Sequence, residues 1–304
     1  MSKKAFVFPG QGSQFVGMAK DLYENSEIAK ELIDKANEAI GADLSKIMFE
    51  GPMDDLKLTN NTQPAIFVHS VVLNSLIKSV KPDMVAGHSL GEYSALVAAG
   101  AIEYADAVKL VRFRGEGMLQ AGIDHPGTMA AVVGAATEKI EECCKQASEK
   151  GIVQCANINS PGQIVISGSV EGVKEAMVLC KENGAKIVKE LPVSGAFHSP
   201  LMQSAKDSLK GELENYNFSD AQIPVYANVT AQAVTDKNEI KNLLFEQVTA
   251  PVRWEETIIN MINDGADEFY EVGPGKVLQG LIKRINKEVK VFGISSYEDL
   301  EKYM

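Results

Sequence analysis

The sequence has few residues that form disulfides or bind metals: its 304 residues include four cysteines and four histidines. No C-x-x-C pair is present, and no histidine lies at zinc-ligand spacing from the cysteines, which are Cys143, Cys144, Cys155 and Cys180. We therefore predict reduced structural thiols, and we expect neither a metal ion nor a redox cofactor.

Long apolar runs and an excess of positive charge are also missing. No run of about 18 apolar residues would span a bilayer, and the first residues lack the apolar region and the cleavage site of a signal peptide. We therefore expect a cytoplasmic protein without a membrane partner. With 30 basic against 41 acidic residues, the net charge of −11 argues against a nucleic-acid partner, because phosphate binding needs a basic surface.

What the sequence does contain is a glycine-flanked turn, Gly87-His88-Ser89-Leu90-Gly91, between an apolar stretch at 84–86 and a helical pattern at 92–99. A strand, a sharp turn and a helix form the nucleophile elbow, in which glycines let the backbone lift a serine hydroxyl into the open. The start of the helix also supplies free N–H groups for a developing oxyanion. The alternative is a plain glycine-serine turn without chemistry.

A nucleophilic serine needs a base, and four histidines are available. His88 precedes the serine and should brace the turn, His69 lies on an apolar helix pattern, and His125 lies in a loop. His198 lies in a loop where the chain returns to the large domain, and such loops between domains often carry catalytic groups. We select His198; because no acidic residue is singled out, a backbone carbonyl could orient its ring.

The order of predicted elements indicates two sheets. Strands alternate with helices at both ends of the chain, which is typical of an α/β domain with a parallel sheet covered on both faces. In this part we expect helices at 63–80 and 104–121 and a strand at 225–229, among others. Between these ends the pattern is βαββαβ, with a turn at 159–162, which is typical of a ferredoxin-like subdomain. We therefore expect a large hydrolase-like α/β domain at 1–125 and 197–304 and an inserted ferredoxin-like subdomain at 126–196.

Several segments together resemble the malonyl-CoA:acyl carrier protein transacylase family, over nearly the whole chain and in the family's order. These segments are Gly10-Gln11-Gly12-Ser13-Gln14, Gly87-His88-Ser89-Leu90-Gly91-Glu92, Arg114-Gly115, Asn159-Ser160-Pro161-Gly162-Gln163, Ala196-Phe197-His198 and Glu271-Val272-Gly273-Pro274-Gly275-Lys276. The resemblance implies a hydrolase-like α/β domain with a ferredoxin-like insertion, and transfer of a malonyl group from malonyl-CoA to acyl carrier protein.

The resemblance also implies a role for each matching residue. Ser89 corresponds to the nucleophile and His198 to the general acid and base. The backbone N–H groups of Gln11 and Leu90 would bind the oxyanion, which agrees with the position of Leu90 directly after the serine. Gln247 corresponds to the residue whose carbonyl orients the histidine.

The malonyl carboxylate needs a cationic partner, and arginine offers a planar fork for its two oxygens. Arg112 and Arg114 are two residues apart on one helix, so only one of them can reach the site. Spacing leaves the choice open, and the resemblance selects Arg114. Phe197 should narrow the space around the α-carbon and favour malonyl over methylmalonyl groups. Asn159 corresponds to a pocket residue from the small subdomain, although a role in the turn is an equal alternative.

Acyl carrier protein is acidic in this family, so its docking on an acidic chain needs a local basic patch. Our candidates are Lys186, Lys189, Lys283 and Arg284, and ordinary solvated surface cations are the alternative. Two other functions are considered: a serine esterase or thioesterase on the same elbow, and a non-catalytic acyl-binding module. The first would release free malonate faster than it loads a carrier thiol, and the second would form no ester on Ser89.

Overall fold

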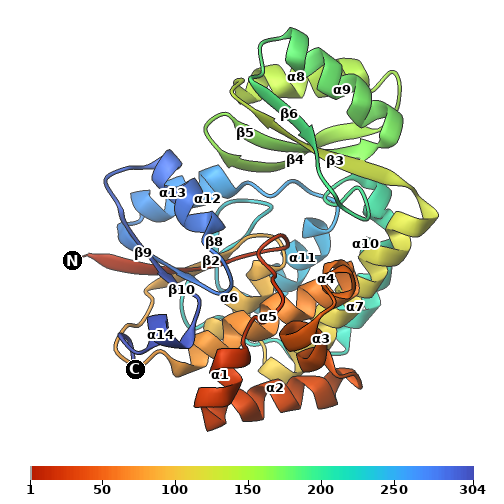
Figure 1. The fold of residues 1–304 in the computed structure, drawn as a ribbon. Helices are drawn as coiled ribbons and strands as arrows, with labels where there is room; N and C mark the ends of the chain where they lie inside the picture. Colours follow the sequence, from red (N-terminus) through yellow and green to blue (C-terminus); the bar gives the residue numbers. More distant parts are fainter. Residues whose placement is uncertain (1) are drawn as a thin grey trace.

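The computed structural model describes residues 2–304 (Figure 1). Its larger part is built on a sheet of five parallel strands and a short antiparallel strand at one edge. The order across this sheet is β10 (Lys290–Ile294), β9 (Ala266–Val272), β1 (Lys3–Phe8), β2 (Met84–Gly87), β7 (Val225–Tyr226) and β8 (Ala233–Val234).

Helices cover both faces of this sheet, as the side chains of β1 illustrate. Phe6 and Phe8 belong to a core that includes side chains of α5 (Thr59–Leu76) and α7 (Tyr104–Asp124). Ala5 and Val7 belong to a core on the other face, with side chains of α12 (Trp254–Asn263) and α13 (Val277–Ile285). Successive residues of a strand point to opposite faces, so a strand buried on both faces is apolar throughout.

The remaining helices of the larger part are shorter or lie outside these layers. They are α1 (Lys20–Asn25), α2 (Glu27–Ile40), α3 (Leu44–Glu50), α4 (Met53–Lys57), α6 (Gly91–Ala98), α10 (Gln203–Glu214), α11 (Lys237–Gln247) and α14 (Tyr297–Leu300), with a 3-10 turn at Pro200–Met202. Within residues 2–304, no helix has both the length and the apolar composition that crossing a membrane requires.

A second, antiparallel sheet forms the smaller part, at the top of Figure 1. Its strands follow the order β4 (Val153–Ser160), β5 (Gln163–Ser169), β3 (Gly127–Val133) and β6 (Ile187–Glu190). Helices α8 (Thr137–Ala147) and α9 (Val170–Glu182) cover one face, and this order is the ferredoxin-like arrangement. All four cysteines are buried as free thiols, and their side chains belong to this small core.

The predicted fold class is therefore confirmed, whereas the division at 126–196 stays a prediction. Several predicted bounds differ from the observed ones, including that of the helix at 104–121, which continues to Asp124. The strand at 225–229 ends at Tyr226, because the side chain of Asn228 binds the elbow and the chain turns there. The turn at 159–162 begins later, since β4 continues to Ser160, and the helix at 63–80 covers Thr59–Leu76.

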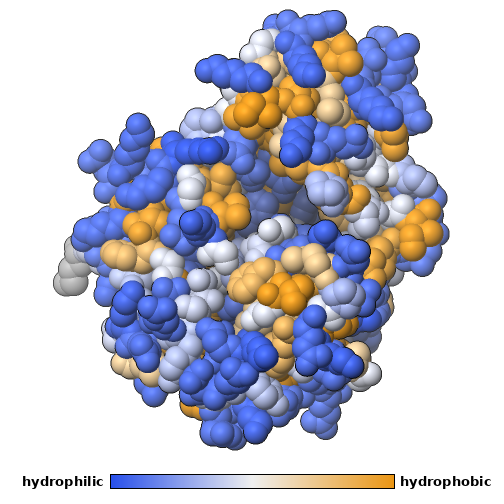
Figure 2. Space-filling model, viewed as in Figure 1, coloured by the Kyte–Doolittle hydropathy of each residue, from blue (hydrophilic) through white to orange (hydrophobic). Residues whose placement is uncertain are grey.

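The parallel strands bring distant segments to one edge of the large sheet. Register pairs Phe8 of β1 with Gly87 of β2, so the loops that follow these two strands start side by side. This edge faces the small sheet, and Figure 2 shows the surface hollowed between the two parts, with hydrophobic residues on both sides of the hollow. In open α/β sheets the carboxyl ends of the strands form the usual ligand site.

Candidate active site

A cavity of about 250 Å³ lies in this hollow and is lined by both parts of the molecule. The large part contributes Ser89, Arg114 and the turn that follows β1, and the small sheet contributes Met129 and Val165. The cavity therefore combines an apolar wall with a few polar groups, which is typical of small-molecule sites.

The elbow depends on close approach of backbone atoms. Ser89 has φ +52°, a left-handed conformation that costs a non-glycine residue about 1 kcal/mol. A Cβ on Gly91 would lie 2.1 Å from the Phe8 carbonyl oxygen, and one on Gly87 would lie 1.8 Å from the carbonyl carbon of Gly91. Both glycines are required for α6 to start directly above the end of β2.

His198 reaches the serine from a separate loop. Its Nε2 lies 2.7 Å from Ser89 Oγ, and its Nδ1 lies 2.9 Å from the Gln247 carbonyl oxygen and 3.1 Å from that of Ala250. Because carbonyls can only accept, Nδ1 carries the proton, and Nε2 is left to accept the serine O–H. Burial and, second, the nearby Arg114 lower the pKa of His198 to about 3, so its ring is neutral near pH 7.

Two backbone donors face the cavity beside the serine. Gln11 and Leu90 both line the cavity, and within residues 2–304 neither backbone N–H has an acceptor. Leu90 is the N-cap of α6, where N–H groups have no partner within the helix. The turn after β1 and the start of α6 thus each contribute a cavity-lining residue with a free backbone N–H.

Arg114 is buried under the serine on α7. Its Nη1 donates to Gln63 Oε1 at 2.8 Å, and its Nη2 donates to Gln247 Oε1 at 2.9 Å and to Ser89 Oγ at 3.2 Å. Both side-chain amides are neutral acceptors, and Nε has no acceptor within residues 2–304. Burial lowers the pKa of Arg114, but arginine keeps its charge near neutral pH. The guanidinium is therefore fixed in place while its charge stays available to an anion.

A buried carboxylate completes the polar layer below the elbow. Glu92 Oε2 accepts from the side-chain amide of Gln247 at 2.8 Å and from the backbone N–H of Asn228 at 3.0 Å. The Gln247 amide also donates to the Ser89 carbonyl at 3.0 Å. Burial raises the pKa of Glu92 to about 7, although these hydrogen bonds and Arg114 act against that rise.

The other predicted pocket residues lie around the same cavity. Asn159 lines it from β4, and its Oδ1 lies 2.8 Å from His88 Nε2, so these two side chains join the small sheet to the elbow. Phe197 lines it next to His198. Arg112 does not reach it: its guanidinium contacts Glu116, Asn60 and Asn61 instead.

The four cations predicted for carrier docking are exposed but are not equivalent. Arg284 donates to Gln163, which lines the cavity, so it lies at the mouth of the hollow. Lys186 packs beside Gly134, next to the turn between β4 and β5. Lys189 lies on β6. Lys283 Nζ donates to the carbonyl of Val289, in the segment between α13 and β10.

Sequence reasoning missed several residues of the site: Gln63, Glu92, Asn228 and the side chain of Gln247. Glu92 left a signal, because it is the one charged residue in the helical pattern at 92–99. Gln63 and Asn228 are ordinary amides in sequence, and their contacts to Arg114 and Ser89 span 51 and 139 residues.

The fold and this geometry are those of an enzyme that acts through a nucleophilic serine, and the comparisons with known proteins show that its class is the acyltransferases. The family model described as acyl transferase domain matches residues 5–300. A malonyl CoA-acyl carrier protein transacylase of Bacillus subtilis (strain 168) is 49% identical over 304 residues, which cover 99% of this chain and 96% of the relative.

Solved structures show the same relation. An acyl carrier protein S-malonyltransferase from Vibrio cholerae is 43% identical, with a TM-score of 0.95 and full coverage of both chains. A malonyl-transacylase solved in complex with its type II PKS acyl-carrier protein is 38% identical, with a TM-score of 0.95 and 99% of each chain covered. The chain belongs to the family of malonyl CoA-acyl carrier protein transacylases.

Proposed function

We propose that this enzyme transfers the malonyl group of malonyl-CoA to the phosphopantetheine thiol of acyl carrier protein through an ester on Ser89. The observation that supports it most directly is the position of Ser89 Oγ, 2.7 Å from the His198 imidazole and 3.2 Å from the Arg114 guanidinium. One atom thus contacts both a base and the cation expected to hold an acyl carboxylate. The names of the relatives support the choice of donor and acceptor.

In the first half-reaction, His198 Nε2 takes the proton of Ser89 Oγ as the oxygen attacks the thioester carbonyl. The oxyanion forms between the N–H groups of Gln11 and Leu90, where one such donor contributes about 3–4 kcal/mol to the transition state. The C–S bond then breaks, and the leaving thiolate of CoA takes the proton from the imidazolium. The Gln247 carbonyl keeps the ring in the required tautomer.

In the second half-reaction, the neutral His198 takes the proton of the carrier thiol, and the sulfur attacks the malonyl ester. The tetrahedral intermediate collapses with the C–O bond breaking, and Ser89 Oγ recovers its proton from the imidazolium. Each half-reaction begins and ends with a neutral imidazole, which agrees with its lowered pKa.

Intact mass after mixing the enzyme with malonyl-CoA tests this proposal. The wild-type protein should gain one malonyl group on the peptide that carries Ser89, and Ser89→Ala should gain none. Ser94→Ala is the matched control, because Ser94 is buried on the same helix and its hydroxyl has no partner within residues 2–304. Equal labelling of wild type and Ser89→Ala would refute the mechanism.

The competing activity is thioester hydrolysis on the same elbow. The two activities differ in the acceptor of the malonyl group, which is the carrier thiol in a transferase and water in a thioesterase. With malonyl-CoA and acyl carrier protein both present, a transferase should load the carrier faster than it releases free malonate. Faster release of malonate would identify a thioesterase instead.

For docking, we propose that the carrier approaches the mouth of the cavity beside Arg284 and also contacts Lys186, which directly precedes β6, and Lys189 of β6. Arg284→Glu should raise KM for the carrier and leave KM for malonyl-CoA unchanged, because an acidic partner loses an attractive rim charge. Lys283→Glu should have the smaller effect, since this side chain is bonded to Val289. Equal changes in both KM values would contradict this surface. A cytoplasmic location stays a prediction.

A further inference from the structure

A buried asparagine joins the two sides of the nucleophile elbow. Asn228 Oδ1 accepts the backbone N–H of Ser89 at 2.7 Å, and its Nδ2 donates to the Gly87 carbonyl at 2.6 Å. The side chain is fully buried. Gly87 is the last residue of β2, and Ser89 lies between that strand and the start of α6, so the N–H of Ser89 has no partner in a sheet or a helix.

The elbow needs such a restraint because Ser89 is in a left-handed conformation. Without the amide, the buried N–H of Ser89 would lack a partner and the Gly87 carbonyl would lose one, so the serine backbone would relax toward an ordinary conformation. Ser89 Oγ would then move relative to His198, which is carried by a different loop. The amide also occupies the N–H of Ser89 and so leaves Leu90 as the free donor beside it.

Asn228 is itself held from inside the molecule. Its N–H donates to the buried Glu92 carboxylate at 3.0 Å, and its carbonyl accepts the backbone N–H of Arg253 at 3.1 Å. These hydrogen bonds join Asn228 to α6 on one side and to the residue before α12 on the other, so they fix its backbone. The amide is presented to the elbow in one orientation.

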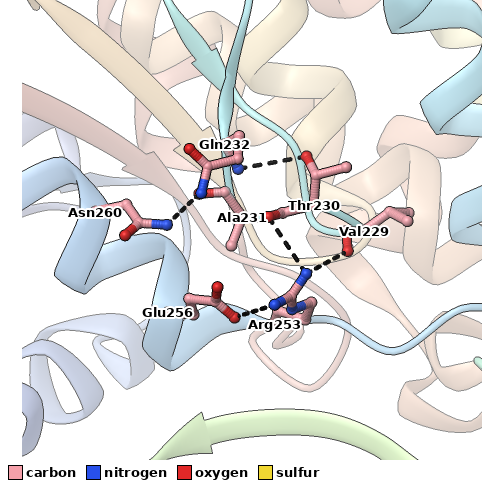
Figure 3. A network of polar contacts seen from close by, with 7 residues as sticks. All are labelled: Val229, Thr230, Ala231, Gln232, Arg253, Glu256 and Asn260. Atoms are coloured by element: carbon pink, nitrogen blue, oxygen red, sulfur yellow. Dashed lines mark hydrogen bonds and ion pairs between the residues drawn. The ribbon is translucent and has the colours of Figure 1, made fainter.

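The loop around Asn228 is also held from the side of α12, as Figure 3 shows. The Arg253 guanidinium points to the carbonyls of Val229 and Thr230 and pairs with Glu256 of α12. Asn260 donates to the carbonyl of Ala231 at 2.8 Å, and Ala231 has φ +57°. A loop with little regular structure is thus fixed at three successive carbonyls.

We propose that Asn228 is a positioning residue for the acylation of Ser89, and that α12 acts through the loop at 227–232 to hold it. This inference rests on the proposed function, because the reaction it affects is the formation of the malonyl-serine ester. Asn228 touches neither acyl group nor carrier in this assignment. It acts by fixing the distance from the serine oxygen to the imidazole.

Single-turnover release of CoA from malonyl-CoA tests the proposal. Asn228→Ala should slow acylation by about 10²-fold, the loss that a misplacement of about 1 Å can cause. The Kd for malonyl-CoA should stay within about twofold when Asn228→Ala is combined with Ser89→Ala, because the elbow does not hold the acyl carboxylate. A role in stability alone would lower the amount of folded enzyme and leave the rate per folded molecule unchanged.

Asn37→Ala is the matched control, since the Asn37 amide also bonds both a backbone N–H and a neighbouring oxygen, at Ser45, outside the cavity. It should acylate at the wild-type rate. If Asn228→Ala fails to fold, Asn260→Ala tests the proposal instead, because it removes only the hydrogen bond to the Ala231 carbonyl. It should slow acylation severalfold and leave KM unchanged.

The outcomes separate this inference from the proposed function. If the wild type forms no malonyl adduct, the proposed function fails, and the inference that rests on it fails with it. If the wild type forms the adduct and folded Asn228→Ala forms it at the same rate, the inference alone is overturned. The same conclusion follows from an unchanged acylation rate in Asn260→Ala when Asn228→Ala does not fold.

Discussion

We propose that Arg114 recognises the acyl group, because its surroundings leave its charge free to bind an anion. Its two fixed partners, Gln63 and Gln247, are uncharged, so a bound carboxylate would be its first direct anionic partner in the cavity. Arg114→Ala should lower kcat/KM for malonyl-CoA by about 10²-fold or more, because hydrogen bonds to charged groups contribute about 1.5–3 kcal/mol each. kcat/KM for acetyl-CoA, which has no carboxylate, should change far less.

The ratio of the two kcat/KM values is the decisive measurement for Arg114. Arg112→Ala is the matched control on the same helix, since its guanidinium contacts Glu116 and Asn60 outside the cavity, and it should leave the ratio unchanged. Equal losses for both thioesters in Arg114→Ala would mean that the residue supports the structure and does not recognise malonyl groups.

A second prediction at this scale concerns pH. A general base works while it is neutral, and the pKa of His198 is lowered to about 3 by burial and then by Arg114. Lowering a base's pKa moves its protonation to more acidic pH, so protonation of His198 should not lower the acylation rate near pH 6.5, the usual pKa of histidine. Arg114→Ala removes one cause of the shift and should move the acidic limb upward.

Single-turnover acylation of the wild type and of Arg114→Ala, measured after brief pH jumps, checks this prediction. His198 should add no midpoint between about pH 5 and pH 8, a window that lies above its lowered pKa, whereas Glu92, with a pKa of about 7, titrates inside it. A midpoint near the ordinary histidine value that persists in Glu92→Gln would contradict the proposed environment of His198.

At the scale of elements, the contact between α5 and α7 places Arg114 next to Gln63. Gly115 lies in this contact, and a Cβ there would approach the Asn60 Cα and the Thr59 carbonyl oxygen to 2.9 Å. Gly115→Ala should lower the free energy of unfolding by about 1–3 kcal/mol through overpacking. It should also lower kcat/KM for malonyl-CoA, because α7 must shift away from α5.

Gly117→Ala is the control within the same helix. A Cβ at Gly117 would meet Ser208 Oγ at 3.4 Å, an ordinary contact, and alanine favours a helix over glycine by about 1 kcal/mol. The Tm of Gly115→Ala should therefore fall, whereas the Tm of Gly117→Ala should rise or stay at the wild-type value. Equal destabilisation of both would show that the close contact of α5 and α7 is not what requires glycine.

How far the sequence predicts these elements depends on their length and pattern. For the long periodic segments α5 and α7, the predicted bounds lie within a few residues of the observed ones. The short helices α1, α3 and α4 were not predicted, because five to seven residues give too little periodicity. The strand at β7 was predicted too long because its apolar pattern continues to Val229, while a tertiary contact of Asn228 ends the pairing.

At the scale of the whole molecule, prediction of the site from the sequence is also limited by contacts between distant segments. Ser89, His198 and Arg114 were identified from local motifs and the family resemblance, and the structure brings all three together. Gln63 and Asn228 were missed because their importance comes only from contacts between distant segments. A motif marks the groups that react, but the groups that hold them in place are ordinary residues until the fold is known.

The two sheets are joined directly, so we predict that they unfold together. Val252 of the large part exchanges backbone hydrogen bonds with Ala156 and Ile158 of β4, at 2.8 and 2.9 Å. Gln154 of β4 adds side-chain bonds to the carbonyls of His198 and Thr249. These contacts cross the cavity-bearing interface, so loss of one part would expose buried polar groups in the other.

Trp254 reports on this interface, since it is the single tryptophan, is fully buried and lies with its ring centroid 5.5 Å from that of His88. In urea, its fluorescence and the far-UV circular dichroism of the whole chain should change at one midpoint. Gln154→Ala should separate the two curves, because it removes the side-chain bonds between the parts. Two wild-type midpoints would instead mean that the small sheet unfolds independently of the large one.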